Sequence, residues 1–188
     1  MLKHIQEYGK NVAIGGFRYV NIEDVDVLLE KVREAVGEKV EVQFFNAELV
    51  ASWQHLYFAA LNALKAFKNG ENISKHLAVE ILLYASAQRQ IRKAVELLGI
   101  KKNMEDVAVL VVGEKTEEVE EVLNVISKFL GGRRDDNVLE LGRDKIAKIR
   151  RVFEISDSEI EAVANGKSLE KTIIDLVIER MALLATER

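Results

Sequence analysis

The apolar and polar positions at the start of the chain predict a β-α-β opening. The run from Val12 to Val20 is rich in apolar residues and contains Gly15-Gly16, which predicts a strand interrupted by a turn or a bulge. A helix is expected from about residue 23 to 35, with Asn21 able to cap its start. Residues 40–45 alternate as a strand does.

The middle of the chain is the most helical part of the sequence. Apolar residues recur at spacings of three and four from about Glu48 to Lys68, and Asn69-Gly70 ends this predicted helix. Ser74 is expected to cap the next helix, whose residues 77–85 are apolar on nearly every side. A helix of that kind lies at the centre of a fold or contacts another molecule.

The second half of the chain predicts one interior strand among helices. The strand is expected at Asp106 to Val112, because a continuous apolar run of that length is typical of a strand covered on both faces. Helices are expected at about 89–98, 117–129, 144–153, 156–164 and from 168 to the end, with an exposed turn at 131–137. We therefore expect an α/β fold: a compact mixed β-sheet flanked by helices, with a helical C-terminal region.

Length and composition limit the class of protein. The 188 residues predict a single α/β domain over 1–188, in which residues 143–188 form a helical extension packed on the core. The chain has no cysteine, which excludes disulfides, thiol nucleophiles and cysteine-based metal sites. The first residues resemble neither a signal peptide nor a transit peptide, and no apolar run is long enough to span a membrane, so a cytoplasmic location is expected.

The charge is unevenly distributed. The net charge is −4, but residues 60–103 hold eight lysines and arginines against three glutamates, for a local charge of +5 and −9 elsewhere. A basic sector on an acidic body is compatible with a small, defined contact to nucleic acid. Within it, the segment Ser86 to Lys93 offers hydroxyl, amide and guanidinium donors beside the apolar Ile91, where a helix begins. The alternative is that Arg92 and Lys93 only solvate the helix.

The search for catalytic chemistry nominates no residue. Gly15-Gly16-Phe17 lacks the third glycine of a dinucleotide fingerprint, and Gly113 to Thr116 lacks the earlier glycine of a P-loop. His76 and Glu80 are one helical turn apart without a third ligand. No serine lies in a nucleophile elbow. We therefore expect no catalytic site, no metal and no cofactor.

The last helix is apolar over about twice the arc of a one-sided surface helix. One side can serve the core, and the other needs either a further layer of this chain or a partner protein. The partner could also be a second copy, giving a homodimer when no other protein covers the helix. The residues assigned to this candidate partner interface are Ile173, Ile174, Val177, Ile178, Met181 and Leu184.

The stretch from Asn46 to Lys101 resembles the small non-catalytic subunit of the KEOPS complex, the family that includes the p53-related protein kinase-binding protein. The resemblance is carried by the N-I-S cap, by the run EILLYAS, and by R-Q-I-x-x-A-V-x-x-x-G-I from Arg89 to Ile100. The strand at 106–112 also fits. These motifs cover about a third of the chain, and the flanking thirds match by pattern only.

The resemblance implies a compact α/β subunit without a catalytic site. Such a subunit binds the small atypical kinase/ATPase subunit and assists the tRNA modification that makes threonylcarbamoyladenosine at position 37. Archaeal-type members also bind the single-stranded 3′ CCA end of tRNA, and the kinase-binding surface would involve the C-terminal helices. Carried onto this chain, the RNA-binding positions are Lys75, Ser86, Arg89, Gln90, Ile91, Arg92 and Lys93. Some members have a glycine where Ala87 and Gln88 stand.

Two other interpretations of the sequence remain open. The first is a regulatory protein that binds and activates the kinase without direct RNA contact, which tRNA binding would distinguish. The second is a small α/β enzyme whose site is assembled from dispersed residues, which a deep pocket with converging polar groups would reveal.

Overall fold

The fold is built on an antiparallel sheet. The computed structural model describes residues 1–37, 39–184 and 186. The strands β1 (Leu2–Ile5), β2 (Lys10–Arg18), β4 (Asp106–Gly113) and β3 (Glu41–Asn46) lie side by side in that order, and the short β5 (Arg133–Arg134) pairs with β2. The expected α/β class with flanking helices is confirmed, whereas the sheet that was expected to be mixed is antiparallel. The pairings among these described strands are all antiparallel, because β4 enters between β2 and β3.

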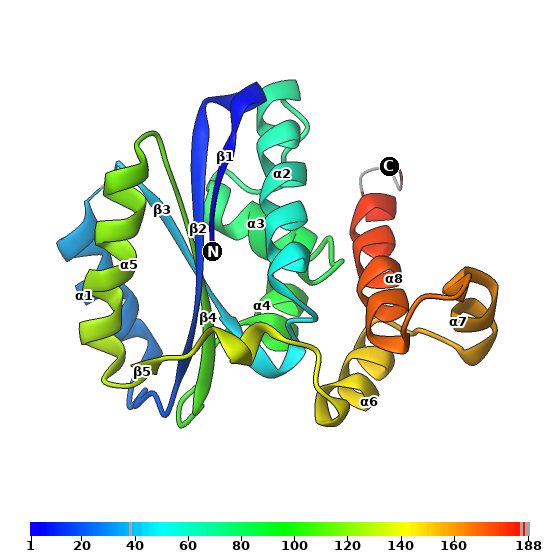
Figure 1. Cartoon of the computed structure of the whole chain (residues 1–188). Coiled ribbons are helices and arrows are strands. Elements are labelled where there is room, and N and C mark those ends of the chain that lie inside the picture. Colours follow the sequence, from blue (N-terminus) through cyan, green and yellow to red (C-terminus); the bar gives the residue numbers. More distant parts are fainter. Residues whose placement is uncertain (38, 185, 187–188) are drawn as a thin grey trace.

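Helices cover both faces of this sheet (Figure 1). The helices α1 (Val25–Val36) and α5 (Thr116–Leu130) lie on one face, and α2 (Trp53–Asn69), α3 (Leu77–Ala85) and α4 (Ile91–Leu98) lie on the other. The apolar run of β4 is buried along its whole length because both faces are covered. The α3 helix is apolar on most sides for the same reason, since it packs against α2, α4, α8 and β3.

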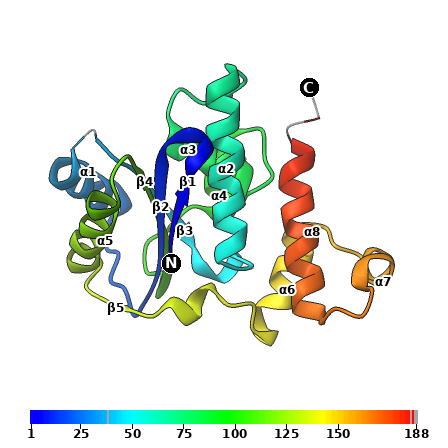
Figure 2. The same ribbon diagram turned by 45° about the horizontal axis from the view of Figure 1, so that its top comes forward.

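The C-terminal helices form a further group beside α2, seen from two directions in Figures 1 and 2. They are α6 (Arg143–Val152), α7 (Asp157–Ala164) and α8 (Leu169–Leu184). Met181 and Leu184 of α8 pack into the core on the α2 side, and Ile173, Leu176 and Val177 pack with α6 in a cluster of their own. Lys145 attaches α6 to the core, because its half-buried side chain donates from Nζ to the carbonyls of Val50 and Val138. Burial lowers the pKa of Lys145 to about 8.

Four predicted helix starts were wrong by two to five residues, and capping side chains explain two of them. The α1 helix begins at Val25 rather than residue 23, because Asp24 caps it in place of Asn21 by accepting from the N–H groups of Asp26 and Val27. The α2 helix begins at Trp53 rather than Glu48, since the Ser52 hydroxyl accepts from the backbone N–H of His55, 3.2 Å away. Ser74 does not cap α3, because that helix begins after His76. The Ser74 hydroxyl instead accepts from the N–H of His76. The basic helix begins at Ile91, so that Arg89 and Gln90 precede it.

Gly15 and Gly16 do not form a turn or a bulge. Both lie inside β2, in register with Val109 and Ala108 of β4. The reason for the two glycines is close packing across the sheet: a Cβ atom on Gly16 would lie 2.4 Å from Cγ2 of Val138. The prediction failed because a chain sequence does not show which distant segment presses on a strand.

Candidate functional site

The predicted RNA-binding segment forms a tight turn between α3 and α4. The N–H of Ala87 donates to the Tyr84 carbonyl at 2.9 Å, and the N–H of Gln88 donates to the Leu83 carbonyl at 3.0 Å. This is the Schellman arrangement, which requires a left-handed residue at the position of Ala87. Ala87 accordingly has φ of +50°, a conformation in which glycine is the usual residue. Of the two positions at which the resemblance implies glycine in some members, Ala87 and Gln88, Ala87 is the left-handed helix end in this chain.

Ser86 supports this turn from inside. It is buried, and its hydroxyl donates to the carbonyls of Leu82 and Leu83 at 2.8 and 3.1 Å. The hydroxyl was expected among the RNA-binding groups, but in this conformation it satisfies the end of α3 and does not face solvent.

The other predicted RNA-binding residues are exposed, and most of them lie together. Arg89 and Gln90 precede α4, and Ile91, Arg92 and Lys93 form its first turn. The side chain of Gln90 makes no capping hydrogen bond, so the first backbone N–H groups of α4 carry no side-chain cap. Arg92 pairs with Glu96 at 2.9 Å, and Ile91 is 45% exposed. We call residues 86–93 the α3–α4 turn.

Lys75 lies apart from this turn. It is exposed just before α3, whereas the α3–α4 turn follows α3, so the nine residues of that helix, about 13 Å at 1.5 Å per residue, separate them. Lys75 instead lines a surface cavity of about 620 Å³ together with Lys10, Lys39 and Glu114. The structure therefore brings Arg89 to Lys93 together and leaves Lys75 at the opposite end of α3.

His55 holds the α3–α4 turn to α2. The imidazole is fully buried; its Nδ1 accepts from the N–H of Ala51 at 3.2 Å, and its Nε2 donates to the carbonyl of Ala85 at 2.7 Å. Burial lowers the pKa of His55 to about 4, so the ring is neutral at pH 7. In the sequence, the signal for this role is the place of His55 among apolar residues in the first turn of α2.

The candidate partner interface on α8 is mostly covered by this chain. Ile173, Val177, Met181 and Leu184 are buried in its own core. Ile174 and Ile178 are half-buried and flank the solvent side of the helix. The short preceding helices thus supply much of the layer that the wide apolar arc of α8 required, and Ile174 and Ile178 are the two members of the set that a partner can reach.

Within residues 1–37, 39–184 and 186, His, Asp and Glu side chains are nowhere grouped in threes that could hold a metal ion. His76 is exposed, and Glu80 is buried with its carboxylate accepting from the N–H groups of Ile73 and Ser74. None of the helices described here is long and apolar enough to cross a membrane.

Comparison with known proteins identifies the family. The family described as "Kinase binding protein CGI-121" matches residues 19–185. The regulatory protein Cgi121 of Methanocaldococcus jannaschii is 32% identical over 149 residues, which cover 79% of this chain and 86% of that protein. The KEOPS complex subunit Cgi121 of Pyrococcus abyssi is 36% identical over 59 residues, which cover 30% of this chain and 34% of that protein. Because the match spans most of the chain, the protein belongs to the CGI-121 family of kinase binding proteins.

Proposed function

We propose that this protein is the subunit of a KEOPS-type complex that binds the kinase and recruits tRNA by its single-stranded 3′ CCA end. Its family makes it a kinase-binding regulatory protein and not an enzyme. The observation that supports RNA recruitment is the exposed, basic α3–α4 turn at the start of α4.

The chemistry of this turn suits a short single strand. Helix N–H groups without a side-chain cap and the cations of Arg89 and Lys93 attract phosphate, while Ile91 and Gln90 offer an apolar surface and an amide to unstacked bases. A duplex would need a longer basic surface, and the net charge of the protein is −4. The turn therefore fits a few nucleotides at the end of a strand.

The first test compares intact tRNA with the same tRNA lacking its terminal CCA, by electrophoretic shift at fixed physiological salt. We expect binding to intact tRNA and a loss of affinity of at least about tenfold after trimming, since stacking and edge contacts to the terminal bases are removed. Equal binding to both would contradict 3′-end recognition. Binding to neither would leave the protein as a kinase-binding regulator without RNA contact.

Reversing one charge of the turn tests the assignment of residues. We expect Arg89→Glu to weaken tRNA binding about tenfold and to make the affinity less sensitive to salt, because a phosphate contact is replaced by repulsion. The matched control is Arg33→Glu, an exposed charge reversal on α1 at the other face of the sheet. If the two variants bind tRNA equally well, the phosphate contact does not lie at Arg89.

For the kinase we propose the solvent flank of α8, at Ile174 and Ile178. We expect Ile174→Glu to weaken association with the kinase subunit at least tenfold in a calorimetric titration, because a charge in an apolar contact is left without a partner. The control is Glu179→Lys, which reverses an exposed charge elsewhere on the same helix. We propose that, in the absence of the kinase, this flank of α8 pairs with the same flank of a second copy of the protein. The Ile174→Glu variant should then be monomeric.

A further inference from the structure

The α3–α4 turn and the C-terminal helices are joined by a continuous series of contacts. The first contact is at His55, which binds the carbonyl of Ala85 immediately before the turn. Phe153 directly follows α6, and its ring stands edge-on to the His55 ring, with centroids 5.5 Å apart and an interplanar angle of 82°. Ala87, the left-handed residue of the turn, also packs against the C-terminal apolar cluster that contains Phe153.

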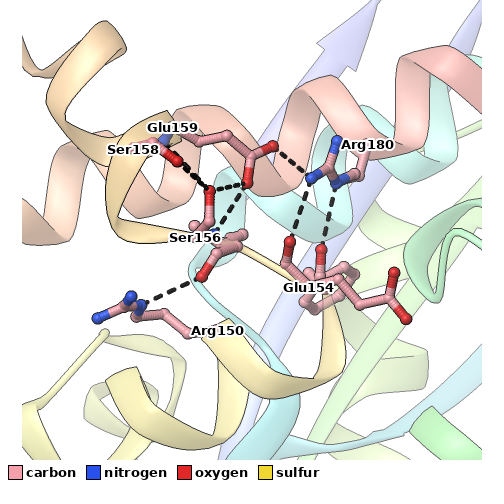
Figure 3. A network of polar contacts seen from close by, with 8 residues as sticks. Arg150, Glu154, Ser156, Ser158, Glu159 and Arg180 are labelled. Carbon is pink, nitrogen blue, oxygen red and sulfur yellow. Dashed lines mark hydrogen bonds and ion pairs between the residues drawn. The ribbon is translucent and has the colours of Figure 1, made fainter.

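The backbone at Phe153 and Glu154 is in turn held by Arg180 of α8, and Figure 3 shows the Arg180 guanidinium beside Glu154. The Arg180 guanidinium donates from Nε to the carbonyl of Phe153 at 3.2 Å and from Nη2 to the carbonyl of Glu154 at 3.3 Å. Arg180 also pairs with Glu159 of α7, whose carboxylate completes a capping box with Ser156. Glu154 has φ of +53°, so this corner depends on its polar contacts to keep its path.

We propose that His55 is a positioning residue for the α3–α4 turn and that, through Phe153 and Arg180, the arrangement of α8 sets the geometry of that turn. The role of the turn in RNA binding rests on the proposed function; the mechanical link does not. Each contact in the series is well defined. The neutral His55 imidazole has a hydrogen-bond partner on each nitrogen, and the buried Phe153 ring packs against it. The Arg180 guanidinium donates to two backbone carbonyls.

One consequence is that occupancy of the solvent flank of α8 and occupancy of the turn are coupled. Ile174 and Ile178 lie on the same helix as Arg180, so a partner that shifts α8 also moves the group that holds Phe153. Coupling between sites is reciprocal, so a kinase that tightens RNA binding is itself bound more tightly in the presence of RNA, by the same factor.

The test measures amide hydrogen exchange in the full chain without RNA. Phe153→Leu removes the ring from His55 and leaves the residues of the turn unchanged. We expect exchange at Ala51, Ala87 and Gln88 to become about tenfold faster relative to the β4 amides, because their hydrogen bonds depend on the positioned His55 and the turn that it fixes. Phe44→Leu is the matched control, since Phe44 is equally buried but packs on the other face of the sheet.

A second variant keeps the experiment decisive if Phe153→Leu fails to fold. Arg180→Lys retains the positive charge beside Glu159, but a single ammonium group cannot reproduce the two-pronged guanidinium geometry that binds the carbonyls of Phe153 and Glu154. It should produce the same pattern of faster exchange. Exchange at the three amides that is unchanged in the folded variants, or changed equally by Phe44→Leu, would overturn the link.

Affinity for a short single-stranded RNA ending in CCA separates this inference from the proposed function. We expect Phe153→Leu to weaken binding about fivefold and Phe44→Leu to leave it unchanged. If the wild-type protein does not bind this RNA, the proposed function fails while hydrogen exchange still decides the link. If the wild type binds and both phenylalanine variants bind equally well, the geometry that the link sets does not affect RNA binding, and the inferred coupling between α8 and the RNA-binding turn is wrong.

Discussion

Lowering the pH from 7 to 5 will reduce the free energy of unfolding by about 2 kcal/mol through His55 alone. The folded pKa is about 4 because the ring is fully buried, whereas an exposed histidine has a pKa near 6.5. Between these values the unfolded chain binds a proton that the folded chain does not. Stability from this group is therefore complete above pH 6.5, and it is lost as the pH falls toward 4.

Denaturant unfolding at both pH values measures this effect. In His55→Gln, the free energy of unfolding should fall by about 2 kcal/mol less between pH 7 and pH 5 than in the wild type. In His76→Gln, which changes an exposed histidine, it should fall as much as in the wild type. An NMR titration of the wild-type imidazole provides a second measurement, in which His55 should not begin to protonate above about pH 5. Titration near pH 6.5 in the folded protein would show that His55 is not held neutral by burial.

Gly16→Ala will lower the free energy of unfolding by about 3 kcal/mol. The added Cβ atom would lie 2.4 Å from Cγ2 of Val138 and 2.7 Å from the carbonyl oxygen of Asp135. The second neighbour is backbone and is fixed there, because the N–H of Asp135 donates to the Gly16 carbonyl at 2.9 Å. Relief of the clash would therefore separate the segment after β5 from the sheet.

Two other glycines provide controls for this prediction. A Cβ atom on Gly15 meets the flexible side chain of Leu123 at 3.1 Å, so Gly15→Ala should cost less. Gly142 has open space around it and a negative φ, so its replacement should stay within about 1 kcal/mol of the wild type. The comparison is made by urea unfolding of the three variants, and an equal effect at Gly16 and Gly142 would refute the packing argument.

The candidate site could be predicted only as a list of residue types along the chain. The basic segment Arg89 to Lys93 was visible as a local charge excess beside an apolar residue, and the structure keeps these residues exposed and adjacent. Ser86 was assigned from the residues of this segment as well as from the family resemblance, and Lys75 from the resemblance, yet Ser86 is turned inward and Lys75 lies at the opposite end of α3. The direction of a side chain at a helix end depends on the cap, which the sequence pattern did not reveal.

The sequence by itself determined the elements whose signal is local. The buried strand at Asp106–Gly113 follows from a continuous apolar run, and the capping box of Ser156 and Glu159 follows from spacing alone. Family membership was likewise visible in the motifs between Asn46 and Lys101.

The tertiary structure alone decided which distant segments meet. Only the folded chain brings Val138 against Gly16, places β4 between β2 and β3, and sets Phe153 beside His55, 98 positions away in the sequence. Periodicity reports which side of an element is apolar, but it does not report what covers that side. That choice is made when packing of the whole chain fills space, and in this protein it determines which apolar residues of α8 remain within reach of a partner.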